Sequence, residues 1–452
     1  MPTGFNHGIA CPIRGPGMSD VQIGMGGLLC LLALIAARVP IGVALIGVSF
    51  SGIWLLMGWQ VAWASLGVVP YNFAASWTLS SVPMFLLLGF ICYHARLTQG
   101  LFRAAGVWLT GIPGGLAIAT IFGSAGFAAV SGSSVACSAA MGRIAVPEML
   151  RHRYHPELAT GTVAVAGTIG ALIPPSIIMI LYGVVAQVSV TKLFLGGISA
   201  GLLTAVGYVL VVLIRVWRDP SLAPSVDQEV PRSEKVAALK ETWPVIMIMI
   251  GTFGGLFGGF FTPTEAGAVG AFMACVVALL RGGLSWDRFR SAILETVLTT
   301  SALLIIAVGA SLLARFLALS GAGEYLSEWI LDLGFDTFYV LIGIALIYLL
   351  LGMFLEPIGA MLLTLPIVLP IIDTTGLSLL WFGVVLTKLL EVGMITPPIG
   401  MNVFVIKGVV GDLVETFAIF RGIFWFLVMD ILVLVLLFGF PDLVLMLPAW
   451  VN

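Results

Sequence analysis

Long apolar stretches separated by short polar segments run along nearly the whole chain. A helix of roughly 20 apolar residues is long enough to cross a bilayer. The first half predicts helical segments at 22–38, 41–58, 69–95, 114–150, 157–187 and 193–214, and the second half at 245–261, 264–281, 292–318, 337–373, 380–410 and 416–437. The pattern therefore predicts an all-α polytopic membrane protein.

The second set of segments follows the first at a constant offset, which the prolines reveal (263 − 40 = 223). Four proline pairs keep this offset: Pro40 and Pro263, Pro147 and Pro370, Pro174 and Pro397, and Pro175 and Pro398. Four matches without a gap indicate an internal repeat. Two interrupted apolar segments at matching places in two halves also point to a transporter binding site.

The fourth segment of each half is too long for one span and is interrupted in its middle. The interruption reads Ser131-Gly132-Ser133-Ser134 in the first half and Phe354-Leu355-Glu356-Pro357 in the second. Irregular backbone at membrane depth is tolerated only where it lines a cavity or is buried in protein. Each of these segments is therefore predicted to be a re-entrant hairpin.

The fifth segment of each half contains a Pro-Pro pair, and a glycine, Gly170 or Gly393, lies four residues before the first proline of the pair. A proline has no backbone N–H and biases the residue before it away from helix, so each segment is predicted to be a broken helix. Each half then has five crossings plus one re-entrant hairpin and one broken helix.

Charge predicts that the halves are inverted. Basic residues flank the first hairpin, and acidic residues flank the second: Arg96, Arg103, Arg143, Arg151 and Arg153 against Glu324, Glu328, Asp332, Asp336 and Asp373. Basic loops stay in the cytoplasm. The first hairpin is therefore expected on the cytoplasmic side, with the second hairpin and the amino terminus outside.

The predicted organisation has five parts: an N-terminal extension at 1–20, a first inverted repeat at 21–214, a cytoplasmic linker at 215–243, a second inverted repeat at 244–440, and a C-terminal tail at 441–452. Residues 1–17 lack the apolar core of a signal peptide, and we expect Met18 to be the natural start. Only 9% of residues are charged and the net charge is −2, so nucleic acid is not an expected partner.

Hairpin tips and broken helices place backbone carbonyls and helix ends inside the membrane. Carbonyls and helix C-termini suit Na⁺, whereas helix N-termini suit anionic groups. The first half offers three serine hydroxyls at its tip, facing the carbonyls near Gly170–Ile173. The second half offers Gly352, Glu356 and Pro357 at its tip, facing Gly393, Thr396, Ile399, Gly400 and Asn402. The alternative is that these residues only kink helices and satisfy their own backbone.

Two charged residues, Lys388 and Glu391, lie three residues apart within an apolar run. A charge inside a membrane segment is costly and is a functional candidate. The interpretation favoured by the spacing is an ion pair between them, near the outer end of their helix. Glu265, after Pro263, is expected to be a helix-start carboxylate.

Other function classes lack support in the sequence. There is no GxxxxGK[ST] loop, so a primary pump would need its ATPase on another chain. No Ser/His or Asp/Asp constellation has a catalytic spacing, and no Cys/His cluster has that of a zinc site. The chain is not expected to be an enzyme, and no catalytic residue is assigned.

Four segments resemble the large permease subunit of TRAP transporters, the DctM-like family. They are GTIGALIPPS at 167–176, the Ser-Gly-Ser-Ser tip at 131–134, LGMFLEPIGAMLLTLPIVLP at 351–370 and GMITPPIGMN at 393–402. The similarity extends over nearly the whole chain from about residue 21. Many members have Asp where this chain has Glu356.

The resemblance implies an elevator-type fold with scaffold and transport domains, in the bacterial inner membrane. It implies Na⁺-driven uptake of an organic anion, usually a carboxylate, with Na⁺ as coupling ion and no organic cofactor. A periplasmic substrate-binding protein and a small four-helix permease subunit, each a separate polypeptide, would be the partners. The alternative is a binding-protein-independent Na⁺/carboxylate symporter of the same superfamily.

The resemblance also implies particular site residues. The first Na⁺ site would use Ser131, Ser134, Gly170, Ile173 and Pro174. The second would use Gly352, Gly393, Thr396 and Ile399. The substrate would lie between the two tips, near Ser133 and Asn402.

Overall fold

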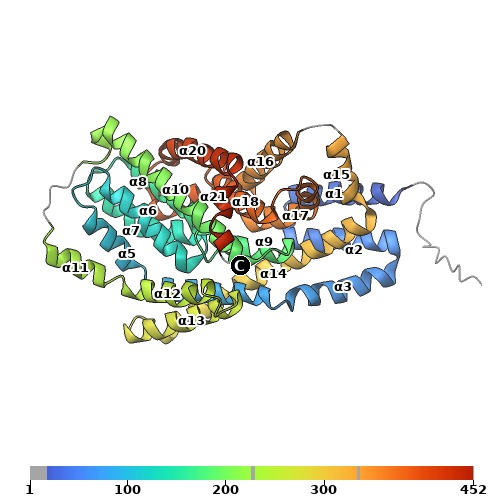
Figure 1. The fold of residues 1–452 in the computed structure, drawn as a ribbon, viewed down its shortest axis with the longest axis horizontal. Helices are drawn as coiled ribbons and strands as arrows, with labels where there is room; N and C mark the ends of the chain where they lie inside the picture. The colour runs from blue at the N-terminus through green and yellow to red at the C-terminus, as the bar shows by residue number, and fades with distance from the viewer. Residues whose placement is uncertain (1–17, 225–229, 333–335, 451–452) are drawn as a thin grey trace, which may run out of the picture. The chain divides into compact units, whose positions relative to one another are not determined.

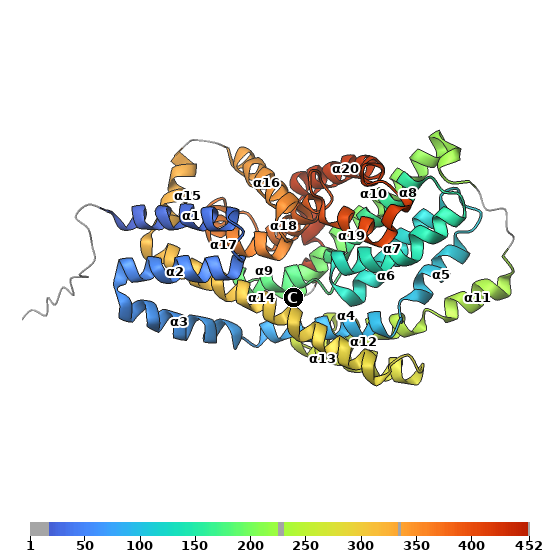
Figure 2. The same cartoon turned by 180° about the vertical axis from the view of Figure 1, so that it is seen from behind.

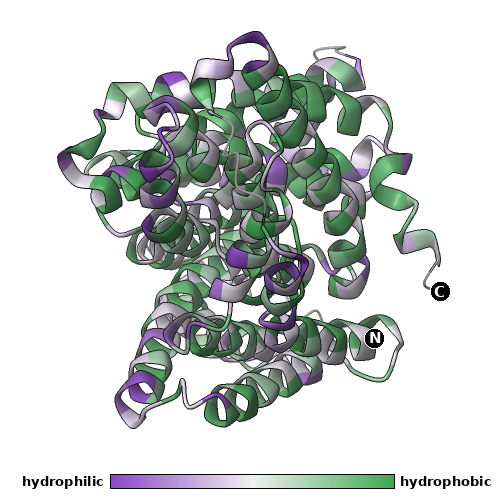
Figure 3. Ribbon diagram, turned by 90° about the vertical axis from the view of Figure 1, so that its left-hand side faces the viewer, coloured by the Kyte–Doolittle hydropathy of each residue, from purple (hydrophilic) through white to green (hydrophobic). Residues whose placement is uncertain are grey.

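The computed structural model describes residues 18–224, 230–332 and 336–450, and all of the regular secondary structure in this part is helical (Figure 1). Within these residues six helices are long and apolar enough to cross a membrane, or up to eight if each bent pair of helices is one span. Figure 3 shows hydrophobic colouring along most of the helices. The prediction of an all-α multi-pass membrane protein is confirmed.

The first half contains ten α-helices among the described residues, and Figure 2 shows them from behind. They are α1 (Asp20–Ala36), α2 (Ile41–Met57), α3 (Trp59–Ala74), α4 (Ser81–His94), α5 (Gln99–Trp108), α6 (Gly115–Ser131), α7 (Ser134–Arg151), α8 (Pro156–Thr168), α9 (Ile177–Ala186) and α10 (Val190–Arg218). Short 3₁₀ turns, η1 (Thr78–Ser80) and η2 (Ile169–Ala171), precede α4 and follow α8.

Eleven α-helices follow α10 among the described residues. They are α11 (Arg232–Lys240), α12 (Trp243–Phe257), α13 (Pro263–Leu280), α14 (Trp286–Ser320), α15 (Ala322–Asp332), α16 (Thr337–Phe354), α17 (Pro357–Thr374), α18 (Leu379–Gly393), α19 (Met401–Val410), α20 (Thr416–Gly439) and α21 (Asp442–Leu445).

Several helix boundaries keep the offset seen in the prolines. Helix α17 begins and ends 223 residues after α7 (357 − 134 and 374 − 151), and α18 begins 223 residues after α8 (379 − 156). Both Pro-Pro bonds, Pro174–Pro175 and Pro397–Pro398, are cis. The inverted orientation of the halves and the predicted domain boundaries stay predictions, because the structure contains no membrane.

One predicted segment needs correction. The helix expected at 69–95 is two helices, α3 and α4 with its leading turn, with a break between Ala74 and Thr78. The apolar pattern could not show this break because both helices are hydrophobic. The segment 215–243, predicted to be the linker between the repeats, contains helical residues: α10 continues to Arg218, and α11 lies within it. Helix α11 has Glu234 in its first turn and Lys240 in its last, which favours helix through the macrodipole.

The chain forms two compact units, and each draws segments from both halves. The smaller unit contains α1 to α3 with segments 302–340 and 362–375. Its helices pack closely around the buried ring of Phe316: a Cβ on Gly27 would lie 2.5 Å from that ring, and one on Gly52 would also clash with it. Small residues that admit a large neighbour are typical of membrane helix packing.

The larger unit is built around α8, which is buried from Leu158 to Thr168. Helix α8 packs on α7 and on α20. At its crossing with α20 the backbones touch, since a Cβ on Gly161 would lie 2.6 Å from the carbonyl carbon of Gly422. Glu265 begins α13 in a capping box with Thr262, which confirms the helix-start carboxylate. All predicted site residues lie in this larger unit.

Candidate functional site

The tip of the first hairpin is the turn between α6 and α7. Helix α6 ends at Ser131, Gly132 has a left-handed φ of 63°, and the Ser133 hydroxyl caps α7 by accepting from the Ala136 amide at 3.4 Å. Glycine is required at 132 by this φ and by space, because a Cβ would clash with the carbonyl oxygen of Pro175. The tip therefore lies directly against the first broken helix.

The first break separates α8 from α9 with five irregular residues after η2. Among the described residues, no hydrogen bond reaches the carbonyl oxygens of Gly170, Ile173 and Pro174. A Cβ on Gly170 would lie 3.3 Å from the carbonyl oxygen of Ser133. The break thus places unpaired carbonyls beside the serines of the tip.

The second tip is the turn between α16 and α17. Glu356 lies in this turn, and its Oε2 accepts from the Gly359 amide at 3.1 Å, so the carboxylate caps α17. Two residues before α16 ends, Gly352 touches Gly393 backbone to backbone: a Cβ on Gly393 would lie 2.7 Å from the Gly352 Cα. The second tip therefore lies against the end of α18.

The second break joins α18 to α19. The Thr396 hydroxyl donates to the Val392 carbonyl oxygen at 2.6 Å, and the Thr396 amide donates to the Gly393 carbonyl oxygen at 3.0 Å. Within the described part of the chain, the carbonyl oxygens of Gly352, Thr396 and Ile399 form no hydrogen bond. Unlike the buried first break, this one is exposed, with Ile399 at 39%.

A buried contact joins the first tip to the second broken helix. The Ser134 hydroxyl donates to Oε1 of Glu391 at 3.0 Å and lies 3.5 Å from the Met394 sulfur. The Asn402 amide nitrogen of the backbone donates to the Met394 carbonyl oxygen at 3.2 Å. The structure therefore brings Ser134 and Asn402 to the same methionine.

Several polar atoms in this region are buried and have no protein partner among the residues described. They are the Ser131 hydroxyl, the second carboxylate oxygen of Glu391, and both side-chain polar atoms of Asn402. Buried polar groups are nearly always hydrogen-bonded, so each unpaired group calls for a ligand, an ion or water. Ser133, the other predicted substrate residue, is only half-buried.

The predicted ion pair between Lys388 and Glu391 was wrong. Lys388 donates instead to Oδ1 of Asp430 on α20, at 2.5 Å, and both side chains are fully buried. The Tyr208 hydroxyl also donates to both oxygens of Asp430, at 2.8 and 2.9 Å, and lies 3.1 Å from the Thr168 hydroxyl. The four groups come from α18, α20, α10 and α8.

Asp430 and Tyr208 were missed at the level of sequence. Asp430 is the one acidic residue inside the apolar stretch 416–437. Its position could have indicated a buried ion pair, because a charge inside a membrane segment needs a partner. The identity of that partner could not be read, since Lys388 lies 42 residues away on another helix.

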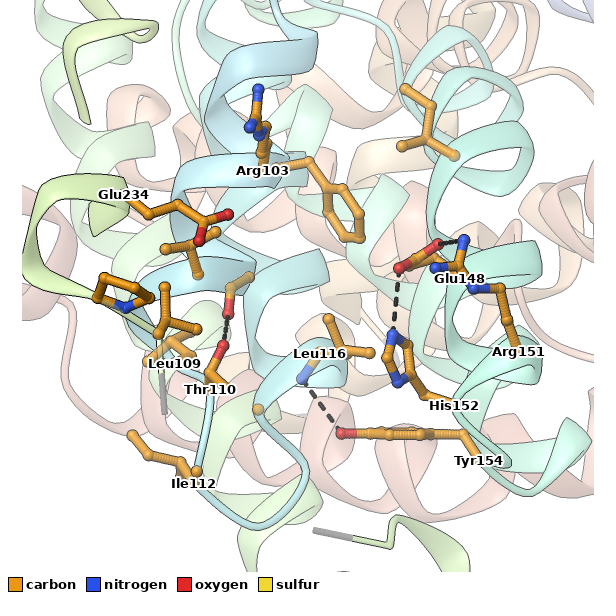
Figure 4. Close-up of a pocket in the computed structure, with 18 residues that line it drawn as sticks. Arg103, Leu109, Thr110, Ile112, Leu116, Glu148, Arg151, His152, Tyr154 and Glu234 are labelled. Atoms are coloured by element: carbon orange, nitrogen blue, oxygen red, sulfur yellow. Dashed lines mark hydrogen bonds and ion pairs between the residues drawn. The ribbon is translucent and has the colours of Figure 1, made fainter. Parts of the chain in front are cut away.

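A surface cavity of about 760 Å³ lies elsewhere in the larger unit, between α5, α6, α7 and α11 (Figure 4). Among its lining residues, Glu148 lies 3.5 Å from Arg151 and 3.2 Å from His152, whereas Arg103 binds Glu241, which does not line the cavity. The Tyr154 hydroxyl accepts from the Leu116 amide at 3.2 Å. None of the predicted Na⁺ or substrate residues lines this cavity.

Comparison with known proteins identifies relatives along most of the chain. It is 33% identical to the C4-dicarboxylate TRAP transporter large permease protein DctM of Pseudomonas aeruginosa, over 86% of this chain and 90% of the relative. It is 31% identical to the sialic acid TRAP transporter large permease protein SiaM of Vibrio cholerae, over 94% and 98%.

The fold also resembles a solved membrane transporter of low sequence identity. The crystal structure of the Alcanivorax borkumensis YdaH transporter matches with a TM-score of 0.59 at 15% identity, covering 96% of this chain and 98% of that one. The family model of the tripartite ATP-independent periplasmic transporter DctM component matches residues 28–443. With that model matching most of its length, the chain belongs to the DctM family of TRAP transporter large permease components.

Proposed function

We propose that this chain is the large membrane subunit of a tripartite transporter that imports an organic anion driven by Na⁺. It would work in the bacterial inner membrane with a small four-helix permease subunit and a periplasmic substrate-binding protein. The family supports this role. The observation that carries the Na⁺ coupling is the meeting of each hairpin tip with a broken helix whose carbonyls are unpaired.

The groups at the first tip fit Na⁺. Hard cations without strong geometric demands favour carbonyl and hydroxyl oxygens, and broken membrane helices supply such oxygens to Na⁺. Among the residues that the structure describes, the buried Ser131 hydroxyl has no protein partner, and the carbonyls of Gly170 and Ile173 are unpaired. Each Na⁺ that moves inward gains about 2.3 kcal/mol per 100 mV of membrane potential.

The substrate is proposed to be a carboxylate that lies between the two tips. The named relatives transport a C4-dicarboxylate and sialic acid, and both compounds carry carboxylate groups. Ser133 caps the start of α7 and Asn402 lies in the first turn of α19, so both residues are at helix N-termini. Helix N-termini attract anions, and the Asn402 side chain keeps free donor and acceptor atoms.

Uptake by purified protein in vesicles tests the proposal. The chain would be reconstituted with its small subunit and supplied with the cognate binding protein and labelled substrate. Uptake is expected with an inward Na⁺ gradient and without ATP. Uptake that is equal without a Na⁺ gradient would refute the coupling, and uptake that needs no binding protein would favour the alternative symporter.

Ser131→Ala is expected to abolish most of the stabilisation by Na⁺ without destabilising the Na⁺-free protein. The hydroxyl that it removes is buried and unpaired, so its loss costs no protein hydrogen bond. The measurement is the melting temperature with and without Na⁺. Ser124→Ala is the matched control, because Ser124 is also buried and unpaired on α6 but lies away from the tip. An equal Na⁺ response in S131A and wild type would contradict the assignment.

Thr396→Ala tests the second Na⁺ site in the same way. The Thr396 hydroxyl donates its proton to Val392, which leaves its lone pairs for a cation. We expect the Na⁺ concentration for half-maximal uptake to rise about tenfold, the scale of one lost oxygen ligand bound to a charge. Unchanged Na⁺ dependence would count against the site.

A cysteine at Leu355, in the second tip, tests the elevator mechanism. In a background without the five native cysteines, it is expected to react from outside in one condition and from inside in another as Na⁺ and substrate vary. Alternating exposure of a whole hairpin requires the transport domain to move. Labelling from outside alone under every condition would argue against an elevator.

A further inference from the structure

The buried charges beside the first tip do not sum to zero. Lys388, Glu391 and Asp430 are all fully buried. The Lys388 ammonium donates to Oδ1 of Asp430 at 2.5 Å, and the Tyr208 hydroxyl donates to both oxygens of the same carboxylate. With both carboxyl groups ionised, one ammonium and two carboxylates leave one negative charge, and that charge belongs to Glu391. An uncompensated buried charge is strongly unfavourable.

The hydrogen bond between Ser134 and Glu391 has a direction that matters. A serine hydroxyl has one proton and two acceptor lone pairs. Ser134 gives its proton to Oε1 of Glu391, so both lone pairs of its oxygen stay available to a cation. The other carboxylate oxygen, Oε2, is buried without a protein partner among the residues described.

We propose that Glu391 is the positioning and charge-compensating residue of the first Na⁺ site. It orients the Ser134 hydroxyl with its lone pairs toward the ion, and its own charge is balanced only when the ion is bound. This inference rests on the proposed Na⁺ coupling. It assigns to Glu391 a role that its expected pairing with Lys388 would have precluded.

The arrangement also gives the ion a reason to accompany the moving domain. With Na⁺ present, the four charges of Lys388, Asp430, Glu391 and the ion sum to zero. Without it, an ionised Glu391 is an unpaired charge in a fully buried position, which opposes movement through the membrane. Na⁺ then contributes to coupling through charge balance in addition to its direct ligands.

Two substitutions separate orientation from charge. Glu391→Gln removes the charge but keeps an oxygen that accepts from Ser134, whereas Glu391→Met removes both. For the full-length chain with its small subunit, E391Q is expected to raise the half-saturating Na⁺ concentration about tenfold, since it removes a buried charge that contacts the Ser134 hydroxyl. Maximal uptake is expected to change less. E391M is expected to raise that concentration further.

Thermal stability supplies a readout that needs no transport. Without Na⁺, E391Q is expected to melt at or above the wild-type temperature, because an uncompensated charge has gone, and Na⁺ is expected to stabilise it less than wild type. Glu148→Gln, at a half-exposed carboxylate far from this cluster in sequence, is the matched control and should respond to Na⁺ like wild type.

Three results would overturn the inference: wild-type Na⁺ stabilisation in E391Q, a lower Na⁺-free melting temperature in E391Q, or a strictly additive effect of Glu391→Gln in the Ser134→Ala background. Residues that act through one another are non-additive. If wild type itself shows no response to Na⁺ in either assay, the proposed coupling fails with it. If the wild-type protein responds to Na⁺ and E391Q responds equally, the proposed role of Glu391 is refuted and the Na⁺ coupling is not.

Discussion

Lys388→Met is expected to destabilise the folded protein by about 3–5 kcal/mol, the cost of leaving a buried charge without its partner. Lys388 is fully buried and donates to Asp430 at 2.5 Å. Its removal leaves Asp430, which is fully buried, with the neutral Tyr208 hydroxyl as its one remaining side-chain partner among the described residues. The loss would be measured as a shift in the unfolding midpoint of the purified protein.

The paired variant Lys388→Met, Asp430→Leu is expected to recover most of that loss. It removes both charges together, and replacement of a buried ion pair by apolar residues of similar size is often neutral. Tyr208 then loses an acceptor but keeps Thr168 at 3.1 Å. If the double variant is as unstable as K388M, shape rather than charge governs this site, and the expectation is wrong.

The recovery experiment also bears on why the pair exists. A buried ion pair contributes little net stability compared with apolar residues that fill the same space. This pair instead joins a helix of the second break, α18, to α20, while Tyr208 and Thr168 bring in α10 and α8. If the double variant regains stability but binds Na⁺ more weakly, the ion pair is needed for the proposed Na⁺ site and not for stability.

The hydrophobic pattern and the prolines predicted much of the fold. Apolar runs of spanning length gave the helices, because a bilayer leaves the backbone few alternatives. Ser131–Ser134 and Glu356 marked the turns that separate α6 from α7 and α16 from α17, since only polar or helix-breaking residues interrupt these runs. The break between α3 and α4 was not predicted, because a short interruption between two apolar helices leaves no trace in hydropathy.

The site was predictable to a smaller extent. The glycines and prolines of the breaks located its backbone, because the chain there cannot stay helical. The pairing of its charges could not be predicted from spacing: Lys388 and Glu391 are neighbours on one helix, yet Lys388 binds Asp430 and Glu391 binds Ser134. Tertiary packing selected partners 42 and 257 residues away over the local one.

Gly393→Val is expected to destabilise the protein by about 3 kcal/mol, at the upper end of what overpacking typically costs. A Cβ at this position would lie 2.7 Å from the Cα of Gly352 and 3.1 Å from the Leu349 carbonyl oxygen. Both neighbours are backbone atoms, which cannot turn aside as a side chain can. Helices α16 and α18 must therefore move apart, and the unfolding midpoint reports the cost.

Gly343→Ala is the matched control, because Gly343 lies on α16 but a Cβ there meets nothing within 4 Å. Alanine favours helix over glycine by about 1 kcal/mol, so G343A should be neutral or stabilising. The separation forced by G393V would also displace the carbonyls of Gly352 and Gly393, so Na⁺ binding at the proposed second site should weaken in the same variant. A G393V protein with wild-type stability and Na⁺ dependence would show that the two helices need no close contact. A fall in stability with Na⁺ dependence retained would place the second ion elsewhere.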